Sequence, residues 1–443
     1  MTATVGAAVL PARGLSVTAT PGQDLDRFLE AVDPRRMGPR LTAALGTGPA
    51  VCDVLDAKYQ PQVGASVLYR LGDRLVRGDL PPHAEDAGTD GRTVVAPGVV
   101  VHPFPLDPDL PSLPRVVDPA FLGPRLADAL GRTHAHGTLR RTGCRSTLLR
   151  YRPGKRATLL VTFRDDGETV VAKAYHDSTK AAAVAEEADA LQATTDPAGV
   201  LRFAPAVAHL ADIAVVVQRR VHGSPLDALL DGPRGPLAGA EAAVRRAGRA
   251  VAELHEASPS TRRERSVERE VRRFAQRATR IQEVAPCAGE ALAGLAQRLA
   301  DTYPQLPEPR LGTVHGDCKP SQFLLGEHEV HLLDMDHLGH SDQAADVGTF
   351  LASLRQLALR RSTRTGSSAM PDCYETLADA FLEGYRGRGG DAGAARTRWQ
   401  EAAALERKAL RAFARAPRSP LVTALTTEAH RRLDLLGGSH HHG

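Results

Sequence analysis

The sequence is poor in two kinds of residue, and each scarcity limits what the protein can be. Aromatic residues make up 4% of the 443 positions, with a single tryptophan. Sequence-tolerant nucleic-acid binding depends on aromatic platforms, and no recognisable nucleic-acid-binding module is present, so we expect no nucleic-acid partner. The five cysteines are scattered and never spaced as C-x-x-C, which excludes a dense disulfide framework and an ordinary zinc module.

Long apolar runs are also missing. No stretch approaches the roughly twenty apolar residues that a membrane helix needs, and the N-terminus has no basic start followed by an apolar core. We therefore expect a cytoplasmic protein with reduced thiols and no membrane contact. With 42% hydrophobic and 24% charged residues, the chain can bury a large core, and its length suits two or three packed units.

Lysine is scarce in a chain whose formal charge is +4, because most basic residues are arginine. A codon bias that writes arginine wherever a surface cation serves is one explanation, and an anion-binding surface is the other. In either case each lysine is a candidate for a specific role. The lysines are Lys58, Lys155, Lys173, Lys180, Lys319 and Lys408.

Two segments near the N-terminus recur further along the chain in the same order. VDPRRMGPRLTAALG (32–46) returns as VDPAFLGPRLADALG (117–131), and KYQPQVGASVLYRL (58–71) returns as RYRPGKRATLLVTF (150–163). Ordered matches at a nearly constant offset indicate a partial internal duplication. Each copy is predicted to form a helix, a strand, a turn and a second strand.

The first copy has no counterpart of VVAKAY (170–175), and residues 81–115 read as a connector with one strand. We therefore place a boundary near 110–116. Residues 1–115 are expected to form an N-terminal extension that stabilises a neighbouring unit, forms a dimer contact or holds a protein partner.

Beyond residue 143 the pattern predicts strands first and helices afterwards. Three strands form a meander over 143–175, a helix with Ser178 as its N-cap follows over 178–194, and two strands cover 206–210 and 213–221. Helices are then predicted over 237–257, 263–300, 342–362, 372–388, 392–416 and 420–436. The chain is thus predicted to be α+β, with units at 1–115, 116–220 and 221–436 and a probable tag remnant at 437–443.

One island of short strands interrupts the helices and carries a concentration of polar groups. In TVHGDCKPSQFLL (313–325), Asp317 follows a buried strand and a glycine, beside His315 and Lys319. A carboxylate in this setting can orient a hydroxyl and accept its proton, so these three residues are candidate catalytic residues. The alternative is that the aspartate caps a turn and the histidine satisfies a backbone carbonyl.

Candidate metal ligands lie in the same island. Asp334 ends the apolar strand VHLLD, and a hairpin would bring it close to Gln322, with Asp336 as a less favoured third ligand. Carboxylate and amide oxygens are hard ligands suited to Mg²⁺. The island is therefore predicted to gather a base and a metal site.

These motifs resemble the catalytic core of the aminoglycoside phosphotransferase and choline kinase superfamily. HGDCKPSQFLL and VHLLDMDHLGHSDQAADVGTFLA follow its pattern of H-G-D-x-x-x-x-N, a strand ending in I-D, and a downstream D-L-A. The resemblance covers about 140–440 and implies a bilobal protein-kinase-like fold with a β-rich N-lobe and a helical C-lobe. Gln322 stands where the family usually has Asn, and Asp346 is expected to brace the catalytic loop.

The resemblance also assigns residues that contact the nucleotide phosphates. Lys173 in VVAKAY falls where the family places the strand lysine that holds them. Glu187 falls where the family places the helix glutamate that pairs with this lysine, with Glu186 as the second choice. The turn RPGK offers Gly154 and Lys155 as a cover for the phosphates.

The implied reaction is in-line transfer of the γ-phosphoryl group of ATP or GTP to a hydroxyl, with Mg²⁺ as cofactor. VVVQRRVHGSPL (215–226) resembles the segment that joins the two lobes, so Gln218 and Val221 are expected to border the adenine pocket. The N-terminal extension is not expected to bind nucleotide, because its copy lacks the lysine strand.

The acceptor cannot be read from these motifs, because many chemistries share the fold. The segments 261–280 and 395–418 are strongly basic, which disfavours a polycationic aminoglycoside and favours a neutral or anionic acceptor, unless they are solvated helix faces. The leading hypothesis is a small-molecule kinase. The alternatives are a Ser/Thr kinase that acts on a peptide or protein, and a kinase-like binding protein without turnover.

Overall fold

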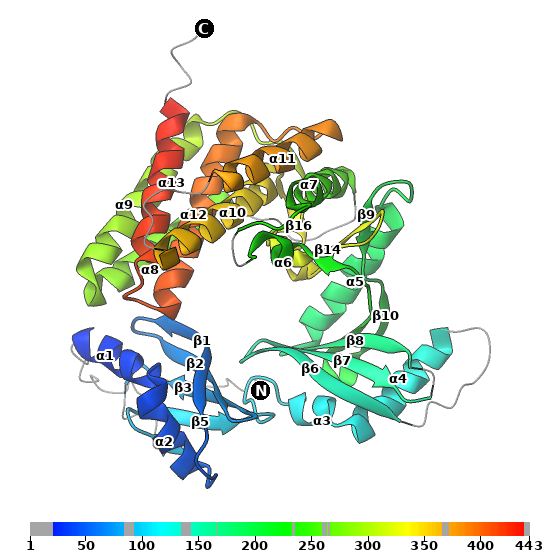
Figure 1. The fold of residues 1–443 in the computed structure, drawn as a ribbon, viewed down its shortest axis with the longest axis vertical. Helices are drawn as coiled ribbons and strands as arrows, with labels where there is room; N and C mark the ends of the chain where they lie inside the picture. The colour runs from blue at the N-terminus through cyan, green and yellow to red at the C-terminus, as the bar shows by residue number, and fades with distance from the viewer. Residues whose placement is uncertain are drawn as a thin grey trace, which may run out of the picture.

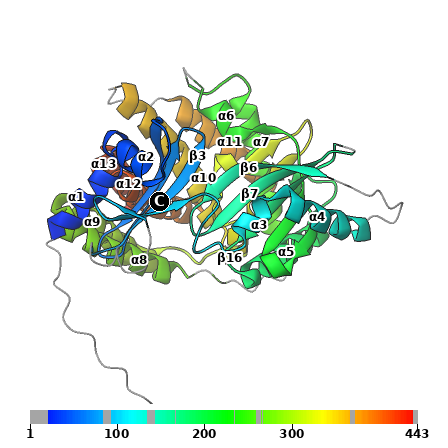
Figure 2. The same ribbon diagram turned by 90° about the horizontal axis from the view of Figure 1, so that it is seen from below.

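The computed structural model describes residues 21–83, 93–133, 143–165, 167–232, 235–258, 264, 266–365 and 372–437. The first twenty residues lie outside the described residues, as does the probable tag at 437–443 except for Gly437, which ends the last helix. The N-terminal extension, the N-lobe and the C-lobe surround the centre of the molecule (Figure 1). Seen from below, the extension and the N-lobe lie side by side beneath the C-lobe helices (Figure 2).

The extension is a five-stranded antiparallel sheet with two helices on it. Its helices are α1 (Pro21–Ala31) and α2 (Pro34–Ala44), and α2 begins after Asp33, whose carboxylate accepts a hydrogen bond from the Arg35 amide. The sheet order is β1-β2-β3-β5-β4. Its strands are β1 (Cys52–Gln60), β2 (Gly64–Leu71), β3 (Arg74–Leu80), β4 (Val94–Val95) and β5 (Val99–Pro103). The predicted one-strand connector was wrong, because it supplies two strands of this sheet.

The N-lobe holds a second five-stranded antiparallel sheet, in the order β10-β11-β8-β7-β6. Its elements are α3 (Leu113–Val117), α4 (Pro119–Thr133), β6 (Cys144–Arg152), β7 (Arg156–Phe163), β8 (Thr169–Tyr175), α5 (Ser178–Thr194), β10 (Ala206–Leu210) and β11 (Val215–Arg219). The N-cap of α5 is Asp177 rather than the predicted Ser178, because the Asp177 carboxylate accepts hydrogen bonds from the amides of Thr179 and Lys180.

The duplicated segments fold alike, and their registers can be compared directly. In the N-lobe, Thr158 of β7 pairs with Lys173 of β8. In the extension, the corresponding Ser66 of β2 pairs with Asp79 of β3. A carboxylate therefore occupies the position of the N-lobe lysine, so the first copy carries the opposite charge at that point.

The C-lobe is helical apart from the predicted island. Its helices are α6 (Leu226–Leu230), α7 (Ala240–Glu256), α8 (Val267–Val284), α9 (Pro286–Thr302), α10 (Ala344–Thr365), α11 (Cys373–Gly387), α12 (Ala394–Arg415) and α13 (Leu421–Gly437). The single helix predicted over 263–300 is two helices, because Pro286 cannot donate a backbone hydrogen bond and starts α9. None of the described helices is long and apolar enough to cross a membrane. The prediction of an α+β bilobal fold is confirmed.

The island consists of two small antiparallel pairs. Strand β13 (Leu311–Val314) pairs with β16 (Gly339–Asp342), and β14 (Phe323–Leu325) pairs with β15 (Val330–Leu332). Strands β12 (Ser224–Pro225) and β9 (Leu201–Phe203) flank the second pair in the order β12-β14-β15-β9. The predicted hairpin is therefore present and sits between segments that come from the N-lobe and from the linker.

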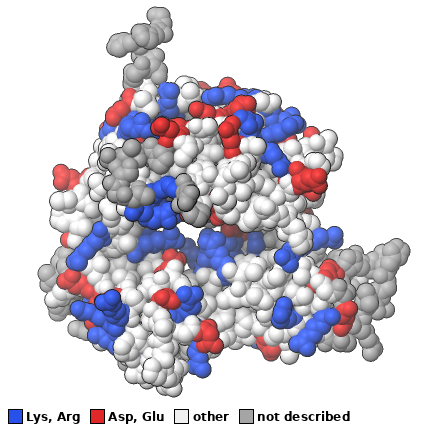
Figure 3. All heavy atoms as spheres, in the orientation of Figure 1, with Lys and Arg blue, Asp and Glu red and all other residues white. Residues whose placement is uncertain are grey.

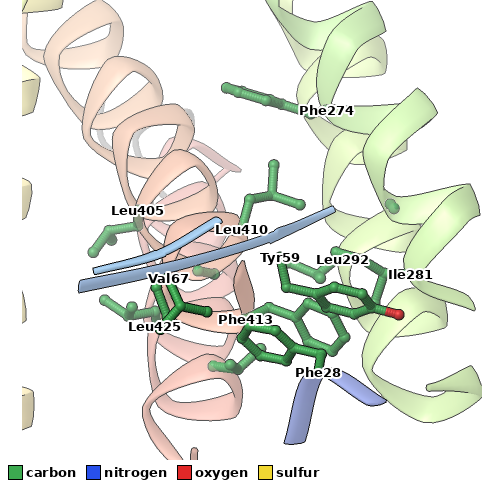
Figure 4. Close-up of a cluster of buried hydrophobic side chains, with 14 of the residues drawn as sticks. Phe28, Tyr59, Val67, Phe274, Ile281, Leu292, Leu405, Leu410, Phe413 and Leu425 are labelled. Carbon is green, nitrogen blue, oxygen red and sulfur yellow. The ribbon is translucent and has the colours of Figure 1, made fainter. Parts of the chain in front are cut away.

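The extension and the C-lobe share one hydrophobic core. Phe28 of α1 stacks on Tyr59 of β1 with ring centroids 4.7 Å apart, and Phe413 of α12 packs against the same tyrosine. Side chains from α8 and α9, including Ile281 and Leu292, close the cluster (Figure 4). Because burial of large apolar side chains dominates such contacts, the extension is fixed to the C-lobe helices.

Candidate active site

The catalytic loop, which contains His315, Gly316 and Asp317, is held by Asp346 of α10. Its carboxylate accepts hydrogen bonds from the backbone amides of His315 (2.6 Å) and Gly316 (2.8 Å), and Nε2 of His255 lies 3.4 Å away. Burial opposes the charge of this carboxyl, but His255 and the loop groups outweigh it and hold the pKa of Asp346 below its usual range. The expected bracing role of Asp346 is confirmed.

His315 is fully buried, and both of its ring nitrogens face the backbone. Nδ1 accepts the amide hydrogen of Asp317 (3.2 Å), so Nε2 carries the proton and donates to the carbonyl oxygen of Leu333 (2.8 Å). The predicted catalytic role of His315 is corrected to a positioning role. Its ring ties the catalytic loop to the end of strand β15, and this outcome matches the alternative that the sequence left open.

Asp317 projects from the turn after Gly316, which has a positive φ of 77°. Its carboxylate is paired with the Lys319 ammonium, and Gln322 Nε2 lies 3.4 Å from the same Oδ2. Burial opposes its charge, but Lys319 and Arg411 outweigh burial and hold the pKa of Asp317 below its usual range. The loop thus presents a charged carboxylate, as a proton acceptor requires.

Asp334 occupies a strained backbone position at the end of the β14–β15 hairpin. It adopts φ 67° and ψ 59°, the left-handed region that non-glycine residues seldom adopt and that concentrates at functional sites. Arg156 of β7 donates two hydrogen bonds to its carboxylate (2.6 and 2.9 Å). Burial opposes ionisation, but this guanidinium keeps the pKa of Asp334 well below its usual range.

Arg156 also pairs with Asp336, whose other oxygen accepts a hydrogen bond from the Tyr175 hydroxyl (2.9 Å). Lys180 of α5 donates to the backbone carbonyl of Asp336 (2.6 Å). Three N-lobe side chains therefore bind the segment 334–336 of the C-lobe. The sequence did not point to Arg156. Its counterpart in the first copy is Gly64, and the predicted phosphate cover used only the neighbouring Gly154 and Lys155.

The donor set fits a magnesium ion that also binds nucleotide phosphates. Among the described residues no three His, Cys, Asp or Glu side chains form a metal site by themselves. Asp334 supplies a carboxylate and Gln322 a buried side-chain amide, and the backbone joins the two segments, because the Leu333 amide donates to the backbone carbonyl oxygen of Gln322 (2.8 Å). Mg²⁺ is commonly held by one or two such side chains with phosphates and water completing its shell.

Lys173 lies on β8, paired with Val216 of β11 on one side and Thr158 of β7 on the other, and is 8% exposed. Burial lowers its pKa from the ordinary range, although Asp334 and Asp336 counteract this. On α5, Glu187 is half-buried and Glu186 is exposed, so of these two only Glu187 lies toward the sheet. The pairing of Lys173 with Glu187 stays a prediction.

The turn between β6 and β7 is bound by the extension. The amide of Gly154 donates to Asp107 Oδ2 (2.8 Å), and the Tyr151 hydroxyl donates to the same oxygen (2.6 Å). Asp107 is in turn paired with Arg77 of β3. Burial lowers the pKa of Lys58 in the extension, and the charge of the exposed Lys155 lowers it further. Sequence reasoning gave no signal for this contact.

The linker residues lie where the lobes meet. Gln218 is buried on β11 and donates to the Ala204 carbonyl oxygen (3.2 Å), while Val221 is half-buried in the linker that follows. Gly223 passes so close to β14 that a Cβ atom would lie 2.9 Å from the Leu325 carbonyl oxygen. The linker is therefore pressed against the catalytic hairpin, and the adenine contacts of Gln218 and Val221 stay predictions.

A buried strand lysine, a braced loop aspartate and a second aspartate at the hairpin end, set between a β-rich and a helical lobe, define a kinase-like phosphotransferase. Residues 150–401 match the model of the phosphotransferase enzyme family, so the chain belongs to that family. The predicted resemblance is confirmed.

Several solved structures of low sequence identity are similar to this chain. They include a glucosamine kinase (19% identity, 94% of this chain and 100% of the other covered, TM-score 0.49) and a macrolide 2'-phosphotransferase from Brachybacterium faecium (16%, 68% and 97%, 0.44). A third is a choline/ethanolamine kinase family protein from Mesorhizobium loti (15%, 71% and 95%, 0.41). A comparison with curated proteins finds no match.

Proposed function

We propose that this protein is a Mg²⁺-dependent kinase that transfers the γ-phosphoryl group of ATP or GTP to a hydroxyl of a small molecule. The observation that carries the proposal is the convergence of the sites of Asp317 and Asp334. Asp317 and Gln322 lie together in the loop, and the backbone joins Gln322 to the residue before Asp334. The charge of Lys173 acts on Asp334 from the N-lobe side.

The residues divide the work of an in-line displacement. Asp317 orients the acceptor hydroxyl and takes its proton, while Lys319 keeps the carboxylate charged until then. The acceptor oxygen forms a bond to the γ-phosphorus, the bond from that phosphorus to the β–γ bridging oxygen breaks, and the nucleoside diphosphate leaves. Lys173 binds the phosphates, and Asp334 with Gln322 would hold the metal, whose charge stabilises them.

The test is Mg²⁺-dependent consumption of ATP and GTP with sugars, amino alcohols, aminoglycosides and Ser/Thr peptides as acceptors. Asp317→Asn should lower kcat by about 10³-fold and leave the nucleotide Kd within about threefold, because the carboxylate acts on the acceptor. Asp189→Asn, a change at an exposed position on α5, should leave both unchanged.

The outcomes separate the alternatives. Phosphorylation confined to peptides would replace the small-molecule proposal with the peptide kinase. Nucleotide binding without turnover on any acceptor would favour the binding protein, and Asp317→Asn with full activity would exclude the assigned base.

A further inference from the structure

Three arginines follow one face of α12 at four-residue spacing, the spacing that aligns side chains on a helix. Arg407 donates to Glu270 of α8 (2.7 Å), and Arg415 donates to Asp56 of β1 (3.1 Å). Arg411 lies between them on the same face and is exposed. Among the described residues it has no hydrogen bond or ion pair, so its guanidinium is available to a ligand.

This face of α12 carries a charge that acts on the catalytic loop. Arg411 is one of the charges that act on Asp317, together with Lys319. The space-filling view shows Lys and Arg side chains gathered around a hollow at the centre of this face of the molecule (Figure 3). Arg152, the last residue of β6, Lys319 and Arg411 lie close enough for their charges to act on one another.

Several cations near the catalytic loop act on one another. Arg407 and Arg415, its neighbours along α12, act on Arg411 with charges of the same sign. Burial lowers the pKa of Lys408 to about 7, with Arg411 and Arg407 adding to the effect. Lys408 is already bound to Ser353 Oγ (2.9 Å). An anion in the hollow would relieve this repulsion.

The position of Arg411 separates it from the nucleotide. The groups that act on Asp334 are Arg156, Lys173 and Arg152, all from the N-lobe. Arg411 belongs to the C-lobe and acts on Asp317, the residue assigned to the acceptor hydroxyl. An anionic group bound by Arg411 is therefore expected on the acceptor rather than on the triphosphate.

We propose that the acceptor is a hydroxyl compound bearing a carboxylate or a phosphate, and that Arg411 binds that group. This inference rests on the proposed kinase function. The planar guanidinium suits both anions, because it donates paired hydrogen bonds to two oxygens. A free ammonium on the acceptor would meet repulsion in the same place, so cationic acceptors should be disfavoured.

The first test measures anion binding without turnover. The full chain, loaded with Mg²⁺ and a non-hydrolysable ATP analogue, is titrated by calorimetry with inorganic phosphate and, separately, with acetate. Saturable binding of at least one of them, weakened about 10- to 100-fold in Arg411→Gln and partly restored in Arg411→Lys, supports the inference. No binding of either anion, or binding that Arg411→Gln leaves unchanged, overturns it. Preference for phosphate or for acetate distinguishes the two anionic groups.

The second test uses matched acceptors with one carbon skeleton: glucose, glucosamine, gluconate and glucose 6-phosphate. Turnover that favours an anionic member, with the acceptor KM raised in Arg411→Gln while kcat and the nucleotide KM stay within about twofold, supports the inference. Turnover of glucose or glucosamine alone overturns it and leaves the kinase intact. Arg418→Gln, an exposed arginine just beyond α12, is the control. Failure of the nucleotide analogue to bind would count against the proposed kinase function. Anion binding to the protein without nucleotide does not test that function.

Discussion

Asp107 connects the N-terminal extension to the turn that is predicted to cover the nucleotide phosphates. Its side chain is fully buried, and it accepts hydrogen bonds from the Gly154 amide and the Tyr151 hydroxyl while pairing with Arg77. The substitution Asp107→Asn keeps the shape of the side chain and removes its charge. Its one remaining carbonyl oxygen could then accept well from only one of the turn's donors, the Gly154 amide or the Tyr151 hydroxyl.

The size of the effect follows from the partners that remain. Removal of one member of a buried ion pair costs about 3 to 5 kcal/mol. Arg77 is 10% exposed and keeps its bonds to Asp79 (2.9 Å) and Asp109 (2.7 Å), so part of its charge stays compensated. We therefore expect the free energy of unfolding to fall by about 2 to 3 kcal/mol. The KM for ATP should rise about tenfold, because a loosened turn no longer holds its geometry.

Urea unfolding and steady-state kinetics measure the two effects. The matched control is Asp109→Asn, because Asp109 also binds Arg77 but its side chain is 55% exposed. An exposed pair contributes at most about 1 kcal/mol. Equal losses in the two variants, or a loss below 1 kcal/mol in Asp107→Asn, would refute the reasoning that the buried carboxylate organises the turn. A stability loss with an unchanged KM would remove the turn from the nucleotide site.

Three further substitutions probe the loop, a buried charge and a helix contact. Asp346→Asn should lower kcat about 10- to 100-fold with little change in nucleotide Kd, because an amide can accept only one of the two loop amides well; activity at the wild-type level would contradict the brace. The pKa of Lys408 is lowered to about 7, so the unfolded chain binds more protons above that pH and unfolding free energy should rise from pH 7 to pH 10. Lys408→Met should flatten this rise in urea titrations, and an unaltered slope would contradict it. Gly384→Ala should lower stability by about 3 kcal/mol, because its Cβ would overlap the Arg245 carbonyl oxygen, whereas Gly387→Ala, with open space around it, should show no loss in thermal unfolding.

Much of the fold could be predicted because its signals are local. The β6–β8 meander, the helix α5 and the C-lobe helices follow from apolar periodicity and from proline and glycine between the elements. The errors have local causes too. Ser178 lost the N-cap position to the neighbouring Asp177, and the connector before residue 115 was predicted with one strand instead of two because β4 is only two residues long.

The candidate site could be predicted only where its residues share a motif. Asp317, Gln322 and Asp334 stand at fixed spacings around one hairpin. The role of His315 could not be predicted, because a ring between two apolar strands can face a substrate or the backbone. Only the folded loop shows both ring nitrogens on backbone groups.

The sequence by itself determined the two repeats, the catalytic hairpin and the chemistry that its side chains can perform, because these depend on residues a few positions apart. The tertiary structure alone decided which distant groups meet. Asp107 reaches Gly154 across 47 positions, and Arg156 reaches Asp334 across 178. Such pairs depend on the path of the whole chain and on a shared core such as that of Phe28 and Phe413, and no local pattern encodes that path.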